Sequence, residues 1–277
     1  MLTGDASLFS KTAHALVPTM GALHEGHLEL VRGAVRHAQD VGLGGVVVSI
    51  FVNPTQFNDP SDFERYPRDT RRDAQLALDA GATWVWTPTV ESVYPPDAAV
   101  GVGELPPVAT EPGLEDRFRP GHFAGVVQVV RRLFQLTNPK VAVFGEKDWQ
   151  QLQVVRAMVA AESNPVEILS APTVRASDGL AMASRNVFLS ADERRAASAI
   201  PDALVRAGGL SDPSDAERAL QDALASAGLE VEYAAVRDAS TLLTPRPSQP
   251  SRALVAVRAG KTRLLDNAAW PAATLRP

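Results

Sequence analysis

The chain has 277 residues, a formal net charge of −5 and no cysteine. Its length allows a large core and two domains, while the missing cysteine excludes disulfides, thiolate catalysis and Cys-ligated zinc or iron–sulfur sites. The acidic balance without a basic patch argues against a nucleic-acid partner. Residues 1–11 lack the apolar centre of a signal peptide, and no apolar run is long enough to span a bilayer. We therefore expect a cytoplasmic protein that does not contact a membrane.

Up to residue 170, apolar segments alternate with segments of helical period. Strands are predicted at 14–18, 46–52, 83–87, 141–144 and 166–170. Helices are predicted at 25–38, 68–80, 122–136 and 148–161. The strands show little polar–apolar alternation, as expected when both faces of a sheet are covered. This order predicts an α/β fold with a Rossmann-like, doubly wound parallel sheet, whose functional loops follow the carboxyl ends of the strands.

The pattern changes after about residue 173. Helices are predicted near 190–207 and 214–227, and short strands at 229–236, 252–258 and 262–266. We therefore predict a Rossmann-like binding domain at 1–173 and a second, smaller α+β C-terminal domain at 174–277.

The ten residues that follow the first predicted strand, Pro-Thr-Met-Gly-Ala-Leu-His-Glu-Gly-His, carry the strongest functional signal. His24 and His27 are three residues apart, which places them on one face of the helix that begins there. Gly26 leaves room for a ligand to approach the backbone. Imidazole donors at a helix N-terminus suit a phosphate, and hence a nucleotide. An incidental helix start and a zinc site are the alternatives, although no third zinc ligand is evident.

Two further segments contain positively charged side chains in or next to predicted loops. Residues 145–148 follow a strand, where Lys147 would hold a positive charge over a polyphosphate, or would belong to an ordinary charged turn. Residues 182–186 lie between the predicted domains. There, Ser184 and Arg185 are either an ordinary polar turn or part of a mobile loop that closes on phosphate oxygens.

The remaining polar signals concern a second substrate. Residues 51–57 end a buried strand in amides, so Gln56 either anchors the loop or recognises a substrate. Asp73 is either a helix cap or a magnesium ligand. Residues 119–123 open a helix whose valine-rich face is mostly core, and part of that face could line a pocket for a small branched substrate.

Together these segments resemble the pantothenate synthetase (pantoate–β-alanine ligase) family of the HxGH nucleotidyltransferase superfamily. The resemblance runs from about Ala15 to Asn267. It rests on the ten-residue string above and on Phe-Val-Asn-Pro-Thr-Gln-Phe, Arg-Pro-Gly-His-Phe, Phe-Gly-Glu-Lys-Asp, Met-Ala-Ser-Arg-Asn and Thr-Arg-Leu-Leu-Asp-Asn. It implies that a homodimer converts ATP, (R)-pantoate and β-alanine into pantothenate, AMP and pyrophosphate through a pantoyl-adenylate, with Mg²⁺.

The resemblance also implies residue roles. The catalytic residues would be His24, His27, Lys147 and Arg185, with His27 as proton donor. ATP would contact Met20, Gly21, Ala22, Leu23, His24, Glu25, Gly26, His27, Gly145, Glu146, Lys147, Asp148, Val174, Met182, Ala183, Ser184 and Arg185. The other substrates would contact Pro18, Met20, Asn53, Gln56, His122, Val126, Val129, Val130 and Gln151. Asp73 would bind Mg²⁺.

The sequence departs from the family at three places. Ala183 stands where the family usually has serine, Arg72 precedes Asp73 where some relatives carry a second acid, and the chain before Ala13 is shorter than usual. The loop 183–186 and the C-terminal domain are the candidates for a lid over the adenylate. The alternatives are another HxGH adenylyltransferase and a nucleotide-binding regulator that has lost catalysis.

Overall fold

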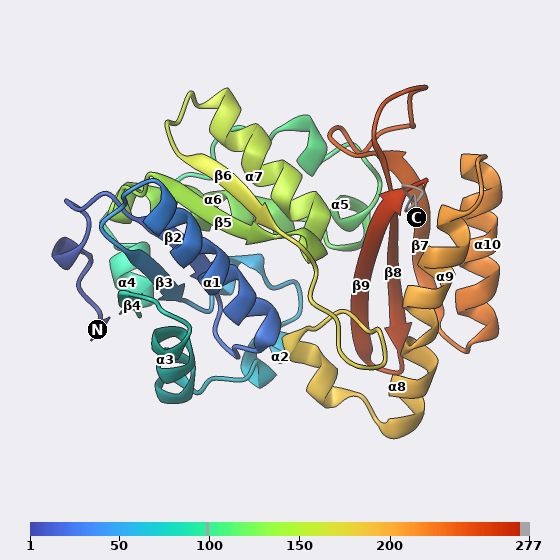
Figure 1. Ribbon diagram of the computed structural model, residues 1–277, viewed down its shortest axis with the longest axis horizontal. Helices are drawn as coiled ribbons and strands as arrows, with labels where there is room; N and C mark the ends of the chain where they lie inside the picture. Colours follow the sequence, from blue (N-terminus) through green and yellow to red (C-terminus); the bar gives the residue numbers. More distant parts are fainter. Residues whose placement is uncertain (98–99, 272–277) are drawn as a thin grey trace.

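The computed structural model describes residues 1–97 and 100–271. Its first part is a six-stranded sheet in the order β1-β4-β3-β2-β5-β6, and every neighbouring pair is parallel (Figure 1). The strands are β1 (Leu2–Thr3), β2 (Ala15–Thr19), β3 (Val46–Ile50), β4 (Trp84–Trp86), β5 (Val141–Gly145) and β6 (Glu167–Ala171). The predicted Rossmann-like sheet is confirmed, and β1 is an addition that its two residues were too few to reveal.

Helices bury both faces of this sheet. The helices of this part of the chain are α1 (Glu25–Asp40), α2 (Pro60–Arg65), α3 (Thr70–Asp79), α4 (Val90–Val93), α5 (Glu115–Phe118), α6 (His122–Thr137) and α7 (Trp149–Ala161). Successive strand residues point to opposite faces. Accordingly, Leu16 and Val47 pack in a cluster with α6 and α7, whereas Ala15 and Val17 pack with α1 and α3. The helices α2, α4 and α5 are single short turns that the sequence pattern did not predict.

The position of the cleft follows from the strand order. On one side of β2 lie β3 and β4, and on the other lie β5 and β6. Parallel sheets bind ligands at the carboxyl ends of the strands, where the order reverses. The loops that leave β2 and β5 carry residues 20–24 and 146–148. The sheet therefore brings together two segments that are more than a hundred residues apart in the chain.

The C-terminal part has its own layers and core. An antiparallel sheet in the order β7-β8-β9 consists of β7 (Glu230–Asp238), β8 (Ser251–Ala259) and β9 (Thr262–Trp270). Helices α9 (Ala199–Gly208) and α10 (Pro213–Ser226) lie along it (Figure 1). A separate apolar cluster includes Ile200, Leu220 and Val255. This is the smaller α+β unit that the sequence predicts.

The region predicted as helical near 190–207 contains two helices, α8 (Ala191–Ala197) and α9. Ser198 ends the first helix and caps the second. Pro201 explains the break, because it has no N–H to bond the carbonyl four residues earlier and is tolerated only in a first helical turn. Short 3₁₀ turns complete the described elements: η1 (Ala6–Leu8), η2 (Pro54–Gln56), η3 (Pro107–Ala109), η4 (Glu146–Asp148) and η5 (Ser184–Phe188).

Polar contacts join the two parts. The guanidinium of Arg263 in β9 donates two hydrogen bonds of 2.6 and 2.7 Å to the buried carboxylate of Glu115, which also accepts from Tyr233 Oη at 2.9 Å. Asn267 donates to the carbonyls of Glu146 and Lys147 at 3.0 and 2.8 Å. The C-terminal sheet is thus attached by hydrogen bonds to the loop after β5.

Among the described residues, no helix combines the length and apolar character needed to cross a membrane.

We expect Glu115→Ala to lower the free energy of unfolding, measured in urea, by about 3 kcal/mol, because the substitution takes the buried carboxylate away from Arg119 and Tyr233 and leaves Arg263 with Glu232 as its remaining carboxylate. The control Asp215→Ala removes the partner of Arg218 in a surface pair whose side chains are 53% and 69% exposed, and should change stability only slightly. Equal losses in the two variants would contradict an anchoring role for Glu115.

Candidate active site

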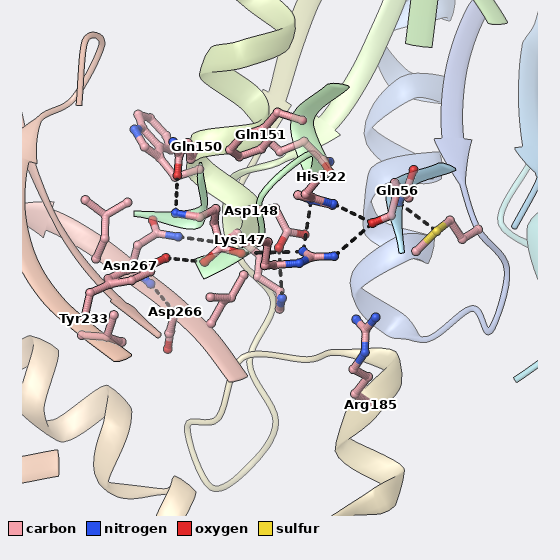
Figure 2. Close-up of a pocket in the computed structure, with 18 of the residues that line it drawn as sticks. Gln56, His122, Lys147, Asp148, Gln150, Gln151, Arg185, Tyr233, Asp266 and Asn267 are labelled. Carbon is pink, nitrogen blue, oxygen red and sulfur yellow. Dashed lines mark hydrogen bonds and ion pairs between the residues drawn. The ribbon is translucent and has the colours of Figure 1, made fainter. Parts of the chain in front are cut away.

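A cleft of about 310 Å³ lies at the carboxyl ends of β2, β3 and β5. It collects most of the predicted site residues: Pro18, Met20, His24, Gly26, His27, Asn53, Gln56, Val126, Val129, Val130, Gly145, Lys147, Asp148, Gln151, Val174, Met182, Ala183, Ser184 and Arg185. A second cavity of about 100 Å³ shares Gln56, Lys147 and Arg185 with the cleft and extends toward the C-terminal sheet, where Tyr233 and Asn267 line it (Figure 2). The two cavities form one continuous candidate site.

The two histidines form a reciprocal cap at the start of α1. His24 is the N-cap residue, and its Nδ1 accepts from the N–H of Gly26 at 3.2 Å. The Nδ1 of His27 accepts from the N–H of His24 at 3.4 Å. A ring nitrogen that accepts carries no proton, so each neutral ring holds its proton on Nε2. Among the described residues, no hydrogen bond engages either Nε2 atom. Both rings therefore retain one donor for a ligand.

Burial keeps both rings neutral. Desolvation, followed by the charge of Lys147, lowers the pKa of His24 from 6.5 to about 4. Desolvation, followed by the neighbouring His24, lowers the pKa of His27 to about 3. The ring centroids are only 4.1 Å apart, so two charged rings would repel each other strongly. At neutral pH the pair consists of two uncharged hydrogen-bond donors.

Gly26 is required by the cap. A Cβ at this position would lie 2.9 Å from Cε1 and 3.0 Å from Nδ1 of His24, closer than side-chain carbons approach. The expectation that this glycine opens the backbone to a ligand is therefore incomplete, because its N–H is already bonded to His24. The glycine allows the imidazole to fold back onto the helix.

Asp73 stabilises the loop in front of the histidines, and the prediction that it binds magnesium is not supported. Its side chain is 1% exposed, and its two oxygens accept from the N–H groups of Ala22 and Leu23 at 2.7 and 2.9 Å. Gly21 and Ala22 have φ values of 81° and 51°, a conformation that turns successive N–H groups toward one anion. Asp73 is that anion. The described residues contain no group of three or more His, Cys, Asp or Glu side chains that could hold a metal ion.

Several predicted ATP contacts lie outside the lining of the cleft. Gly21, Ala22 and Leu23 form the turn that Asp73 holds, and Leu23 is buried in the core beside α1. Glu25 pairs with Arg32 on the surface of α1. Glu146 pairs with Arg252 at 3.2 Å and so contributes to the contact with the C-terminal sheet. The side chains of Leu23, Glu25 and Glu146 are thus engaged within the protein, and an ATP contact by these five residues stays a prediction.

The segment that includes η5 packs against the loop before α1. Ser184 Oγ donates to the carbonyl of Ala22 at 3.1 Å. Arg185 lines the cleft and is paired with Asp62 of α2 at 2.7 Å. On the opposite wall, Lys147 Nζ lies 3.4 Å from Asp148. Each cation thus has a carboxylate beside it, which holds the side chain in place at the cleft. The sequence did not point to Asp62, because α2 has too little periodicity to be recognised.

The amide side of the site is formed by η2. The side-chain oxygen of Gln56 accepts from Asn53 Nδ2 at 3.1 Å, and its Nε2 lies 3.0 Å from the sulfur of Met20 (Figure 2). Val126 and Val130 of α6 line the same cleft as Gln151 of α7. This combination provides amide groups next to an apolar wall, which suits a small molecule with polar and branched ends.

His122 lies near Gln56, but both of its ring nitrogens are bonded within the protein, one to Arg119 and one to the Gln56 carbonyl. The ring lines the smaller cavity only. The prediction that His122 contacts a substrate is therefore replaced by an internal role. Sequence reasoning missed Arg119, although it belongs to the same Arg-Pro-Gly-His-Phe string.

Comparison with known proteins decides the family. A model of the pantoate-beta-alanine ligase family matches residues 5–269. The chain belongs to this family. It is 48% identical to the pantothenate synthetase of Rubrobacter xylanophilus over 92% of this chain and 90% of that one. The pantothenate synthetase of Bradyrhizobium sp. is 47% identical over 96% of this chain and 93% of its own.

Solved structures of the family have the same fold. A pantothenate synthetase from Thermus thermophilus superimposes with a TM-score of 0.88 and 40% identity, over 96% of this chain and 98% of that one. The pantoate-beta-alanine ligase of Francisella tularensis, solved in complex with beta-gamma ATP and beta-alanine, has a TM-score of 0.78 and 29% identity over 97% of each chain. The family resemblance inferred from six short strings is confirmed over residues 5–269.

The lowered pKa values of His24 and His27 make the folding stability depend on pH. Above pH 6.5, His24 and His27 are mostly unprotonated in both the folded and the unfolded protein. Between pH 6.5 and about 4, the unfolded chain binds protons at these two rings, whereas the folded protein does not. We expect the melting temperature to fall as the pH drops through this range. The double variant His24→Asn/His27→Asn, in which asparagine can still cap the helix, should show a shallower dependence. An unchanged slope would contradict the neutral pair.

Proposed function

We propose that this protein condenses (R)-pantoate with β-alanine to give pantothenate, AMP and pyrophosphate, through a pantoyl-adenylate intermediate. One observation carries the proposal: two neutral imidazoles with free Nε2–H donors line the same cleft as Lys147. The membership of the family and the nearby amide groups support the choice of substrates.

In the first step, a carboxylate oxygen of pantoate attacks the α-phosphorus of ATP and pyrophosphate leaves. No protein nucleophile is needed, so catalysis consists of alignment and of charge stabilisation. Negative charge grows on the phosphate oxygens, where His24 and His27 would donate hydrogen bonds and Lys147 and Arg185 would supply positive charge. Because the imidazoles are uncharged, they would act as hydrogen-bond donors rather than as acids that release a proton.

In the second step, the neutral amine of β-alanine attacks the acyl carbon of the adenylate, AMP leaves with the bonding electrons of the acyl–oxygen bond, and the proton that the amine loses passes to the departing phosphate or to water. The adenylate must be kept from water meanwhile. Loop 183–186 supports this role, because it lines the cleft and Ser184 attaches it to the Ala22 carbonyl in the loop before α1. Pantoate would place its carboxylate toward the phosphate donors, its hydroxyl groups near Gln56 and Gln151, and its dimethyl end against Val126, Val129 and Val130.

Magnesium enters this proposal only as part of the ATP substrate. The oxygens of Asp73 are already bonded to backbone N–H groups, so this residue does not fit a metal ligand. Magnesium in phosphoryl-transfer sites is often held largely by the substrate phosphates. The homodimer, the cytoplasmic location and the lack of a nucleic-acid partner remain predictions from the family and from the sequence.

The function is tested by measuring AMP release from Mg-ATP with each acceptor omitted in turn. We expect steady AMP release only with both pantoate and β-alanine present, and pantoate-dependent exchange of pyrophosphate into ATP without β-alanine. Exchange that needs no pantoate, or that proceeds equally with a nucleotide acceptor, would contradict the proposed substrates.

We expect His27→Ala to lower the rate of this exchange by roughly 10²-fold or more, because the loss of one preorganised donor at a developing charge typically has an effect of that size. His37→Ala, at the far end of α1, is the matched control and should leave the exchange rate unchanged. A near-normal rate in His27→Ala would remove this imidazole from the proposed mechanism.

A further inference from the structure

The turn that carries Gln56 has little stability of its own. It is the single 3₁₀ turn η2, joined to β3 by a short loop. Such turns have poor hydrogen-bond geometry and gain their stability from neighbouring elements. The side chain of Gln56 can hold a fixed direction in the cleft only if the backbone beneath it is fixed from outside.

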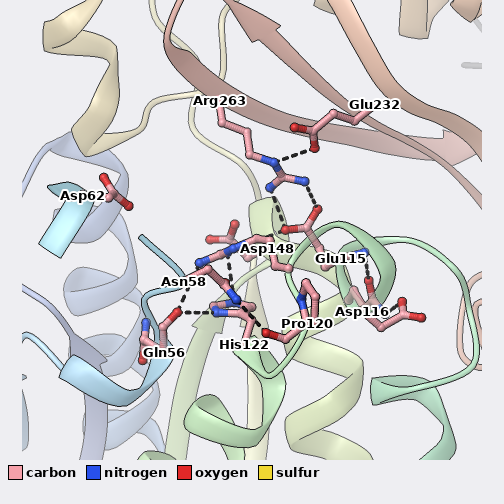
Figure 3. Close-up of polar contacts among 12 residues, drawn as sticks. Gln56, Asn58, Asp62, Glu115, Asp116, Pro120, His122, Asp148, Glu232 and Arg263 are labelled. Carbon is pink, nitrogen blue, oxygen red and sulfur yellow. Dashed lines mark hydrogen bonds and ion pairs between the residues drawn. The ribbon is translucent and has the colours of Figure 1, made fainter. Parts of the chain in front are cut away.

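His122 provides one such constraint. Its Nδ1 lies 2.9 Å from the backbone carbonyl oxygen of Gln56, and its Nε2 lies 3.0 Å from Nη1 of Arg119 (Figure 3). A guanidinium can only donate, so Nε2 must accept and the ring proton must lie on Nδ1. The ring therefore donates to the Gln56 carbonyl. Arg119 thus fixes the tautomer that the Gln56 carbonyl requires.

Arg119 is itself held by a buried charge. Its Nη1 lies 3.6 Å from Glu115, whose carboxylate receives two hydrogen bonds from Arg263 of β9 (Figure 3). Burial alone would raise the pKa of Glu115, but the hydrogen bonds and charge of Arg263 hold it below its usual value. The carboxylate stays ionised between two arginines. The contacts run without interruption from the C-terminal sheet to η2.

A close backbone contact fixes the other side of the turn. A Cβ at Gly125 in α6 would lie 2.4 Å from the carbonyl oxygen of Thr55 and 2.8 Å from the Cα of Gln56. Asn53 Nδ2 also donates to the Gly125 carbonyl at 3.2 Å. Helix α6 and η2 therefore meet backbone to backbone. Any side chain at residue 125 would displace the turn from its present position.

We propose that His122, oriented by Arg119, is a positioning residue that fixes the η2 turn through the Gln56 carbonyl and so directs the Gln56 amide at pantoate without contacting it. This inference rests on the proposed function, because it assumes that Gln56 binds pantoate. It assigns to the Arg-Pro-Gly-His-Phe string a role in substrate affinity that acts through another residue.

The experiment is a double-mutant cycle on the full-length protein, read as the KM for pantoate and the kcat of AMP release. His122→Leu should raise the KM for pantoate roughly ten- to hundredfold, since a displacement of about 1 Å can cost that much. In a Gln56→Ala background, His122→Leu should add little, because the group that it positions is already gone. His122→Asn should recover most of the loss, since its side-chain N–H can replace Nδ1–H. The KM for ATP should stay within about twofold throughout, because the HxGH pair is untouched.

Each outcome decides a separate point. Additive effects of His122→Leu and Gln56→Ala on KM, or no rescue by asparagine, would overturn positioning through Gln56. If Gln56→Ala alone left the pantoate KM unchanged, the assignment of Gln56 in the proposed function would fail and this inference with it.

Gly125→Ala is an independent variant that tests the same inference. It should raise the pantoate KM even if His122→Leu folds poorly. An unchanged KM in a folded Gly125→Ala protein would also overturn the inference. Melting temperatures establish folding, and His37→Asn serves as the control histidine substitution.

Discussion

The hydrogen bond from the Gly26 N–H to His24 Nδ1 determines what the start of α1 can offer a ligand. A bare helix N-terminus binds an anion through its backbone N–H groups. Here two of the N–H groups in and around the first turn are bonded to imidazoles, and two more in the preceding loop are bonded to Asp73. The two imidazoles therefore add ring N–H donors that project beyond the backbone. This arrangement extends the reach of the helix end and keeps its donors uncharged.

Two buried carboxylates organise the site without being part of the proposed chemistry. Asp73 fixes the loop before the histidines, and Glu115 holds Arg263, which lines the cleft, and Arg119, which lines both cavities. Each lies at a place where water is excluded, which is stable only because several donors converge on it. An acid in a nucleotide site is easily taken for a metal ligand. In this protein, these two acids position positive or hydrogen-bond-donating groups that face the ligand.

Sequence predicted the part of the site that depends on local rules. The parallel sheet could be recognised from valine-rich strands, and its carboxyl edge gathers Lys147, Gln56 and the histidines, as expected. Glu115 and Arg263 are 148 residues apart in the chain, so no local sequence pattern predicts their contact. The role of Asp73 was ambiguous for a related reason: a cap, a metal ligand and a loop anchor all need one carboxylate at a helix start. The break at Ser198 also follows from a local rule, since Pro201 is tolerated only in the first turn of a helix.

The loop that contains Ala183 illustrates how a lost hydroxyl can be tolerated. Ser184, the next residue, uses its own hydroxyl to bond the Ala22 carbonyl, so the loop remains attached to the HxGH segment. Arg185 is held at the cleft by Asp62 and keeps its charge there. The alanine thus removes one donor from a wall that still carries a guanidinium, an ammonium and two imidazoles. Because hydrogen bonds to a charged group are individually worth about 1.5–3 kcal/mol, the remaining donors can sustain the proposed binding of a triphosphate, although more weakly than a wall with the serine.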